Sequence, residues 1–114
     1  MPTILGLVGA EIPDRVQGRD ASPLILGKKM DWNNEAFIHH STNKQAYLFT
    51  EDYELAYTDE GKKGFLYDRK KDLLQMDNLY DKPGYKEIIE KMKKKIVEHH
   101  KKYNTPMYKW LKNI

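Results

Sequence analysis

Residues 45–68 read QAYLFTEDYELAYTDEGKKGFLYD, and this stretch decides the fold. Its aromatic and aliphatic side chains recur at the spacing of pleated strands, and short polar segments interrupt them. The pattern predicts strands at 45–50, 53–58 and 64–68, and residues 35–41 predict a fourth strand ahead of them. Because the connections are short and polar, we expect the four strands to pair as an antiparallel meander.

The sequence after these strands is typical of a long amphipathic helix. From Tyr85 onward the apolar residues fall on one stripe and lysines and glutamates occupy the other face, until Pro106 removes a backbone donor. The stripe comprises Ile88, Ile89, Met92, Ile96, Val97 and Tyr103. A four-stranded sheet needs cover on one face. The predicted fold class is therefore α+β, a four-stranded antiparallel sheet covered by a long C-terminal helix.

The first 34 residues are expected to form a short helix and a connecting loop. Residues 2–8 (PTILGLV) begin with proline, precede Gly9 and are apolar on almost every side. Such a helix either packs into the core of its own domain or needs a covering surface from elsewhere. With strands over 35–68 and a loop and helices over 69–114, the chain is interpreted as a single domain of 114 residues.

The composition excludes several classes of function. The chain has no cysteine, which rules out disulfides, thiolate metal sites and a cysteine nucleophile. No run approaches the roughly 18 apolar residues that a membrane span needs. Residues 1–10 lack the basic start of a signal peptide. The net charge of +3 is small and sits mainly in residues 91–102. The compartment stays open.

The lysine-rich helix face has two interpretations. Acidic residues lie one turn away from most of its lysines, as on a solvated helix face. A weak nucleic-acid binder using the same lysines is the other interpretation, and we do not favour it because exposed aromatics amid basic residues occur only around Tyr108–Trp110.

Few residues are candidates for chemistry. The chain has no GxGxxG, no GxxxxGK[ST] and no HExxH motif. His39 and His40 are neighbours on a predicted strand, so they point to opposite faces and cannot chelate one ion together. Two interpretations are open for this pair. One histidine lines a substrate cleft, or both are polar strand residues that form hydrogen bonds. His99 and His100 lie near a helix C-terminus, where a structural role is favoured. Trp32 is expected to anchor its loop.

Three stretches resemble the C-terminal region of the sulfatase family, which has an alkaline-phosphatase-like fold. Residues 2–13 resemble the family's PTIL-x-L-x-G-x-x-x-P, and residues 17–27 resemble QGRSLxPLLxG. Residues 66–79 resemble LYDLxxDPxExxNL. The order and spacing of the three motifs extend over nearly the whole chain.

The sequence also departs from the family pattern. Leu73 replaces the usual proline and Gln75 the usual glutamate, and Phe49 and Glu54 stand where the family often has arginine and lysine. Those basic residues can face the sulfated substrate in relatives. The resemblance therefore does not carry this substrate contact over to the present chain.

The resemblance implies that the catalytic groups and the C-terminal region occupy different parts of the enzyme. Family members hydrolyse sulfate esters with a formylglycine made from Cys or Ser in a [CS]-x-P-x-R motif and with a calcium ion, and both lie upstream of the region resembled here. Neither Ser22 nor Ser41 begins that motif. We expect no catalytic residue, metal or cofactor in this chain, with calcium only in a full-length relative. In the family, the helix that corresponds to Met1–Val8 packs on the catalytic domain. The expected partner of this segment is therefore the catalytic domain of a sulfatase or a second copy of the chain.

The predicted function is that of the C-terminal portion of a sulfuric ester hydrolase that shapes the substrate cleft. Candidate substrate-binding residues are Trp32, His39 and His40, and the isolated chain is expected to be inactive. The alternative is a free-standing protein-interaction module without enzymatic activity, binding through Met1–Val8 and the Tyr108–Trp110 tail. The sequence does not identify the sulfated substrate.

Overall fold

The computed structural model describes residues 1–40 and 42–114, so that Ser41, at the end of the first expected strand, lies outside the described residues. The chain forms two compact units, Met1–Asn33 (unit 1) and Asn34–Ile114 (unit 2). Each is described by itself. The single-domain interpretation stays a prediction.

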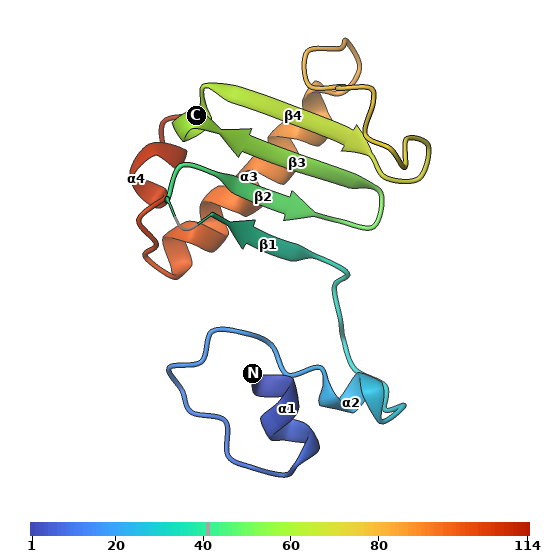
Figure 1. Cartoon of the computed structure of the whole chain (residues 1–114), viewed down its shortest axis with the longest axis vertical. Helices are drawn as coiled ribbons and strands as arrows, with labels where there is room; N and C mark the ends of the chain where they lie inside the picture. Colours follow the sequence, from blue (N-terminus) through green and yellow to red (C-terminus); the bar gives the residue numbers. More distant parts are fainter. Residues whose placement is uncertain (41) are drawn as a thin grey trace. The chain divides into compact units, whose positions relative to one another are not determined.

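Unit 2 contains the predicted sheet (Figure 1). Its four strands are antiparallel and follow one another in the order β1-β2-β3-β4. The strands are β1 (Ala36–His39), β2 (Ala46–Phe49), β3 (Tyr53–Thr58) and β4 (Lys63–Asp68). The predicted meander is confirmed, because short polar turns join β1 to β2 and β2 to β3, and the short 3-10 turn η1 (Asp59–Gly61) joins β3 to β4.

The strand register places a row of leucines on one face of the sheet. Leu48 pairs with Leu55, and Leu55 pairs with Leu66. All three are fully buried. Side chains alternate between the faces of a strand, so this register also assigns Ala46 and Tyr57 to the same buried face. The core of unit 2 lies on this side of the sheet.

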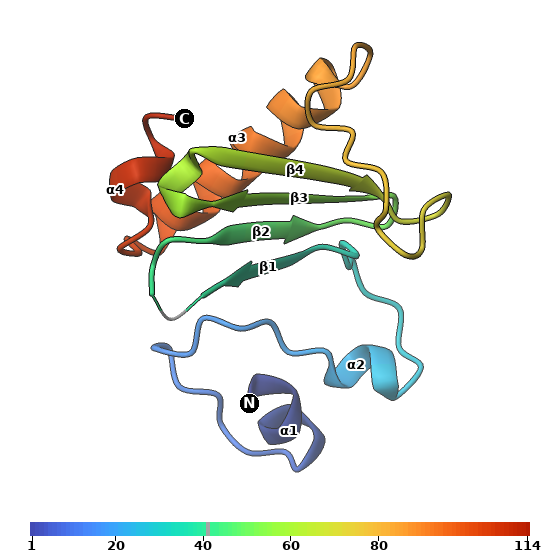
Figure 2. The ribbon, with the colours of Figure 1, turned by 45° about the horizontal axis from the view of Figure 1, so that its top comes forward.

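The long helix α3 (Lys86–Lys102) covers that face, as Figure 2 shows in a view turned by 45° from that of Figure 1. Its buried residues Ile89, Met92, Ile96 and His100 follow helical spacing and contribute to the core. The short helix α4 (Tyr108–Leu111) extends the cover with Met107 and Leu111. The predicted α+β architecture is thereby confirmed.

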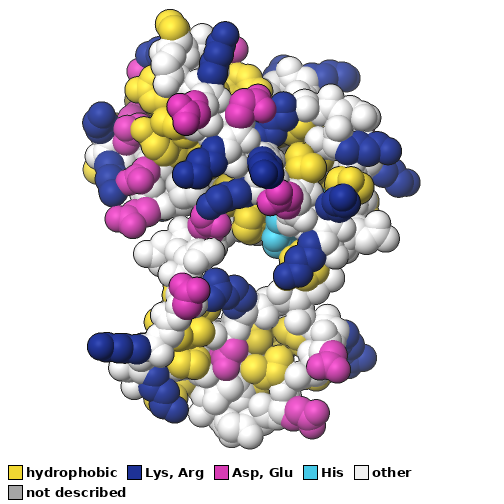
Figure 3. All heavy atoms as spheres, turned by 180° about the vertical axis from the view of Figure 1, so that it is seen from behind, with side chains coloured by type: hydrophobic (Ala, Val, Ile, Leu, Met, Phe, Trp, Pro, Cys, Tyr) yellow, Lys and Arg dark blue, Asp and Glu magenta, His cyan; other side chains and the backbone are white. Residues whose placement is uncertain are grey.

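The opposite side of α3 is solvated. Figure 3, seen from behind the sheet, shows basic and acidic side chains interspersed there. Lys93 and Lys94 pair with Glu90 and Glu98 at 3.5 and 3.9 Å. This mixture of opposite charges supports the interpretation of a solvated face over that of a nucleic-acid surface. None of the described helices combines the length and apolar character needed to cross a membrane.

Unit 1 contains two short helices, α1 (Pro2–Leu7) and α2 (Ser22–Ile25), held together by polar contacts. The backbone N–H of Ala21 donates to Thr3 Oγ1 at 3.0 Å, and the Ser22 hydroxyl donates to Asp20 at 2.9 Å. Gly6 lies so close to Asp20 that a Cβ would meet its two carboxylate oxygens at 2.5 and 2.6 Å. Hydrogen bonds rather than an apolar core therefore hold this unit together.

Candidate functional site

Trp32, the first candidate residue, belongs to unit 1 and is half-buried. The guanidinium of Arg19 stacks over its ring, with 4.2 Å from the guanidinium carbon to the ring centroid. Arg19 also donates from Nη2 to the backbone oxygen of Asp31 at 2.8 Å. A cation stacked on an indole and tied to the adjacent backbone fixes the ring, in agreement with the expected anchoring of the loop.

His39 and His40 lie at the end of β1 in unit 2. The His39 ring meets that of His100 edge-on at 5.9 Å, which places it on the side of the sheet that α3 covers. The His40 Nδ1 accepts a hydrogen bond from the Thr42 backbone N–H at 3.3 Å. The two imidazoles have separate surroundings, as expected from strand alternation, and both are exposed. Trp32 lies in the other unit.

His99 and His100 form a packed seam between α3 and β1. The His99 ring stacks on Phe37 at 4.0 Å with nearly parallel planes, and it also contacts Tyr103 at 4.9 Å. His100 is fully buried, and its Nδ1 is 2.7 Å from Thr105 Oγ1. Its Nε2 has no hydrogen-bond partner among the described residues.

Burial governs the protonation of this seam. Burial, assisted by His99 and His39, lowers the pKa of His100 to about 4. Burial, followed by the charges of His39 and Lys102, also lowers the pKa of His99. Both imidazoles are therefore neutral near pH 7. A fully buried neutral imidazole has no access to a substrate, so His100 is a packing residue, as the sequence indicated.

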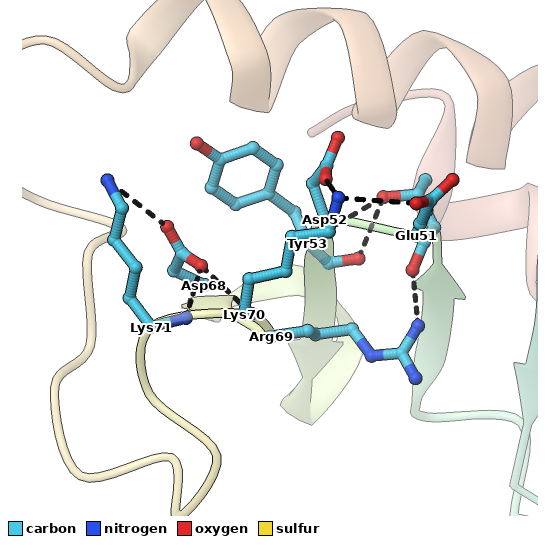
Figure 4. Close-up of polar contacts among 8 residues, drawn as sticks. Glu51, Asp52, Tyr53, Asp68, Arg69, Lys70 and Lys71 are labelled. Carbon is cyan, nitrogen blue, oxygen red and sulfur yellow. Dashed lines mark hydrogen bonds and ion pairs between the residues drawn. The ribbon is translucent and has the colours of Figure 1, made fainter.

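A polar network joins the β2–β3 turn to the end of β4, and sequence reasoning missed it (Figure 4). The Lys70 Nζ lies 2.5 Å from Asp52 and 3.2 Å from Glu51, and hydrogen bonds to these two carboxylates raise its pKa. Arg69 donates to the Thr50 backbone oxygen. Asp68 accepts hydrogen bonds from the backbone N–H groups of Lys70 and Lys71. Adjacent acids already neutralise the Lys70 ammonium, so it offers little to a sulfate group.

A second contact that the sequence could not reveal joins two departures from the family pattern. Gln75 Nε2 donates a hydrogen bond to the buried carboxylate of Glu54. The resemblance indicates lysine and glutamate at these two positions in relatives. Here an acid and an amide replace them and still form a hydrogen bond. The two departures are thus a matched pair at one place in the fold.

The family resemblance implies a formylglycine and a calcium ion for sulfate ester hydrolysis. No group of three or more His, Cys, Asp or Glu side chains within residues 1–40 and 42–114 is placed to hold a metal ion. The calcium ion implied for relatives therefore finds no fitting ligand set in this part of the chain. The sequence also has no cysteine, and neither of its serines precedes a P-x-R motif.

Comparison with known proteins places these observations in a family. The sequence model described as "N-sulphoglucosamine sulphohydrolase, C-terminal" matches residues 1–102. The chain is 27% identical to an N-acetylglucosamine-6-O-sulfatase of Bacteroides thetaiotaomicron, with 90% of the chain and 20% of the relative covered. It is 30% identical to an ulvan-active sulfatase of Formosa agariphila, with 86% and 21% covered. The chain thus spans about a fifth of the length of these relatives.

A solved structure shares the fold. It comes from work on the metabolism of multiple glycosaminoglycans by Bacteroides thetaiotaomicron, and the chain matches it with a TM-score of 0.77 at 26% identity. The match covers 95% of this chain and 27% of that one. Sequence and structure therefore both relate the chain to a minor portion of a much larger protein.

Proposed function

Because this chain belongs to the family of C-terminal regions of N-sulphoglucosamine sulphohydrolase, we propose that it forms one wall of the substrate cleft of a sulfuric ester hydrolase. The catalytic groups belong to the remaining part of such an enzyme, about four-fifths of the length of its relatives. The chain itself contributes shape and substrate contacts, and alone it is inactive.

One observation carries this proposal: the match over residues 1–102 is to the C-terminal region of a sulfohydrolase family. Hydrolysis of a sulfate ester needs a strong nucleophile and cations that balance the developing negative charge. The ammonium of Lys70 is already paired with Asp52 and Glu51. A role in substrate selection is compatible with these features.

We further propose that the substrate is a sulfated sugar, with Trp32 as the candidate contact residue of unit 1 and either His39 or His40 as that of unit 2. One relative is named for N-acetylglucosamine 6-O-sulfate, and a structural neighbour comes from work on glycosaminoglycans. A rigid indole offers an apolar platform to a sugar ring, and an exposed imidazole offers hydrogen bonds to hydroxyl or sulfate oxygens. The stacking of Arg19 on Trp32 adds a positive charge that suits a sulfated ligand.

The test compares two substrates in the full-length enzyme that contains this chain. Trp32→Ala, His39→Gln and His40→Gln are assayed on N-acetylglucosamine 6-O-sulfate and on a small aryl sulfate. We expect kcat/KM on the sugar to fall about 10-fold for a lost contact worth roughly 1.4 kcal/mol, with the aryl sulfate unaffected. Lys94→Gln, on the solvated face of α3, is the matched control. Unchanged kcat/KM on the sugar for all three variants would refute the cleft role.

The alternative function, a free-standing interaction module, receives support from one of its two proposed surfaces. Ile4 and Val8 are 62% and 71% exposed, so the Met1–Val8 segment offers apolar surface to a partner. The Tyr108–Trp110 tail is less available, because Trp110 donates its indole N–H to the Asn43 backbone oxygen and Met107 and Leu111 are buried. Gel filtration separates the two functions: a clean monomer at high concentration argues against the module.

A further inference from the structure

The face of the sheet opposite α3 is unusually apolar. Its two central rows run across all four strands, and only one of their eight positions is charged. The rows are Ala36–Phe49–Glu54–Tyr67 and Ile38–Tyr47–Ala56–Phe65. We call these residues the outer aromatic face; in Figure 1 it lies toward the viewer, with α3 behind the sheet. A sheet face exposed to water normally carries polar side chains. The composition of this face is therefore atypical of a solvent-exposed surface.

The aromatic rings on this face are arranged in two pairs. Tyr47 and Phe49 stack along β2 with centroids 6.5 Å apart, and Phe65 and Tyr67 stack along β4 at 6.4 Å. Ala56, between the pairs, is almost fully buried by its neighbours. The result is a shallow apolar platform whose rigid rings suit a packed interface.

A loop beside β4 adds three exposed apolar side chains. Leu73, Leu74 and Met76 are 82%, 81% and 82% exposed. The loop is nevertheless well braced, because the Asp72 carboxylate accepts hydrogen bonds from the backbone N–H groups of Met76 and Asp77 at 3.0 and 2.8 Å. These bonds lower the pKa of Asp72. A loop that is fixed by hydrogen bonds and exposes three large apolar side chains to water is typical of a protein–protein interaction site.

The loop and the outer aromatic face belong to one surface. Gln75, between the exposed residues of the loop, donates its hydrogen bond to Glu54, the one charged residue of the central rows. That bond satisfies a buried carboxylate and holds the loop against the sheet. The opposite side of unit 2 differs, since charged residues of both signs cover α3 there (Figure 3).

We propose that the outer aromatic face and the 73–76 loop are the surface on which unit 2 docks to the catalytic domain of its sulfatase. This inference rests on the proposed function and adds the interface to it. The occupant follows from length, because the chain spans only about a fifth of its relatives and its family is a C-terminal region. Aromatic residues, leucine and methionine are typical of a permanent protein–protein interface. A charged residue lies at the edge of this surface: the guanidinium carbon of Arg69 is 5.6 Å from the centroid of the Phe49 ring.

The test compares the 114-residue chain with the full-length sulfatase. In the chain alone, Leu74→Glu combined with Met76→Glu should leave the Tm unchanged, because both side chains already lie in water. In the full-length enzyme the same pair should lower the Tm by about 2–4 °C, since it places two carboxylates in an apolar interface. Lys94→Glu, on the far side of unit 2, loses its pair with Glu98 and should change the Tm of both proteins by the same small amount.

Hydroxyl-radical labelling provides a second measurement that needs no substitution. Met76, Tyr47 and Tyr67 should be labelled strongly in the chain alone and several-fold less in the full-length enzyme. Equal labelling in the two proteins, or an unchanged Tm of the double variant in the full-length enzyme, would overturn the proposal. Light scattering gives a further outcome that would overturn the proposal. If the chain is dimeric and the double variant is monomeric, the surface binds a second copy of the chain and not the catalytic domain.

Sulfate ester hydrolysis by the same full-length protein separates the two proposals. An active enzyme whose loop variant behaves like the control retains the proposed function and loses the docking surface. A protein that protects the surface but hydrolyses no sulfate ester retains the docking surface and loses the function.

Discussion

Unit 2 closes a core with its own residues, whereas unit 1 does not. In unit 2, a helix and a sheet bury leucine, isoleucine and methionine side chains completely. In unit 1, only Pro2 and Ser22 are buried, and the apolar residues of α1 face outward or are half-buried. Apolar burial is the main favourable term in folding. The comparison indicates that unit 2 encloses an apolar core of its own, whereas unit 1 encloses none.

The largest expected effect is the contrast between two identical substitutions. Ile96→Ala removes a fully buried side chain of unit 2 and should lower the free energy of unfolding by about 3 kcal/mol. Ile4→Ala removes a largely exposed side chain of unit 1 and should change it by less than about 0.5 kcal/mol. Urea denaturation of the 114-residue chain measures both. Similar losses for the two variants would mean that unit 1 has a core of its own.

The sequence predicted the difference between the cores of unit 1 and unit 2 only in part. The period-2 pattern around Leu55 and the helical stripe through Ile96 indicated the strands, the helix and the buried side of the helix. The pattern did not indicate that β3 is buried on both faces, Glu54 included. The apolar character of residues 2–8 indicated a helix that needs cover, but it left open whether that cover is internal. Tertiary placement of a six-residue helix depends on contacts that no local pattern encodes.

The next expected effect is on the pH dependence of unit 2. In the folded chain the pKa of His100 is about 4, whereas an unfolded histidine has a pKa near 6.5. The unfolded state therefore binds more protons between these values, and stability is lost as the pH falls from about 6.5 to about 4. The loss should approach about 3 kcal/mol at 1.36 kcal/mol per pKa unit.

Denaturation midpoints at pH 7.5, 5.5 and 4.5 measure this effect. His100→Asn, which keeps a hydrogen-bonding group near Thr105 and cannot titrate, should lose most of the dependence. The groups that face His100 are His39 and His99, and both remain in this variant. A pH profile of His100→Asn identical to that of the parent chain would contradict the assigned role of the seam.

The smallest expected effect concerns the Glu54–Gln75 pair. Gln75→Glu places a second carboxylate against the buried Glu54 and should cost about 1 kcal/mol at pH 7. Adding Glu54→Lys should recover that loss, because it restores an attractive pair. A double-mutant cycle by urea denaturation measures the coupling. Purely additive changes would show that the two side chains do not interact.

The candidate site was less predictable than the fold. The sequence singled out Trp32, His39 and His40 by residue type, but their surroundings depend on partners distant along the chain, such as Arg19 for the indole and His100 for His39. The Lys70 network and the Glu54–Gln75 contact join segments about 20 residues apart, which spacing alone cannot bring together. The lack of a cysteine, in contrast, was readable from composition.

The most direct test of the account is an assay of the purified 114-residue chain on an aryl sulfate with calcium present. The account predicts no product above the enzyme-free reaction, because it assigns the nucleophile and the metal to the remaining four-fifths of such an enzyme. Circular dichroism of the same sample should show the helix and the sheet, so that inactivity is not a failure to fold. Calcium-dependent turnover by this folded chain would contradict the claim that catalysis lies outside residues 1–114.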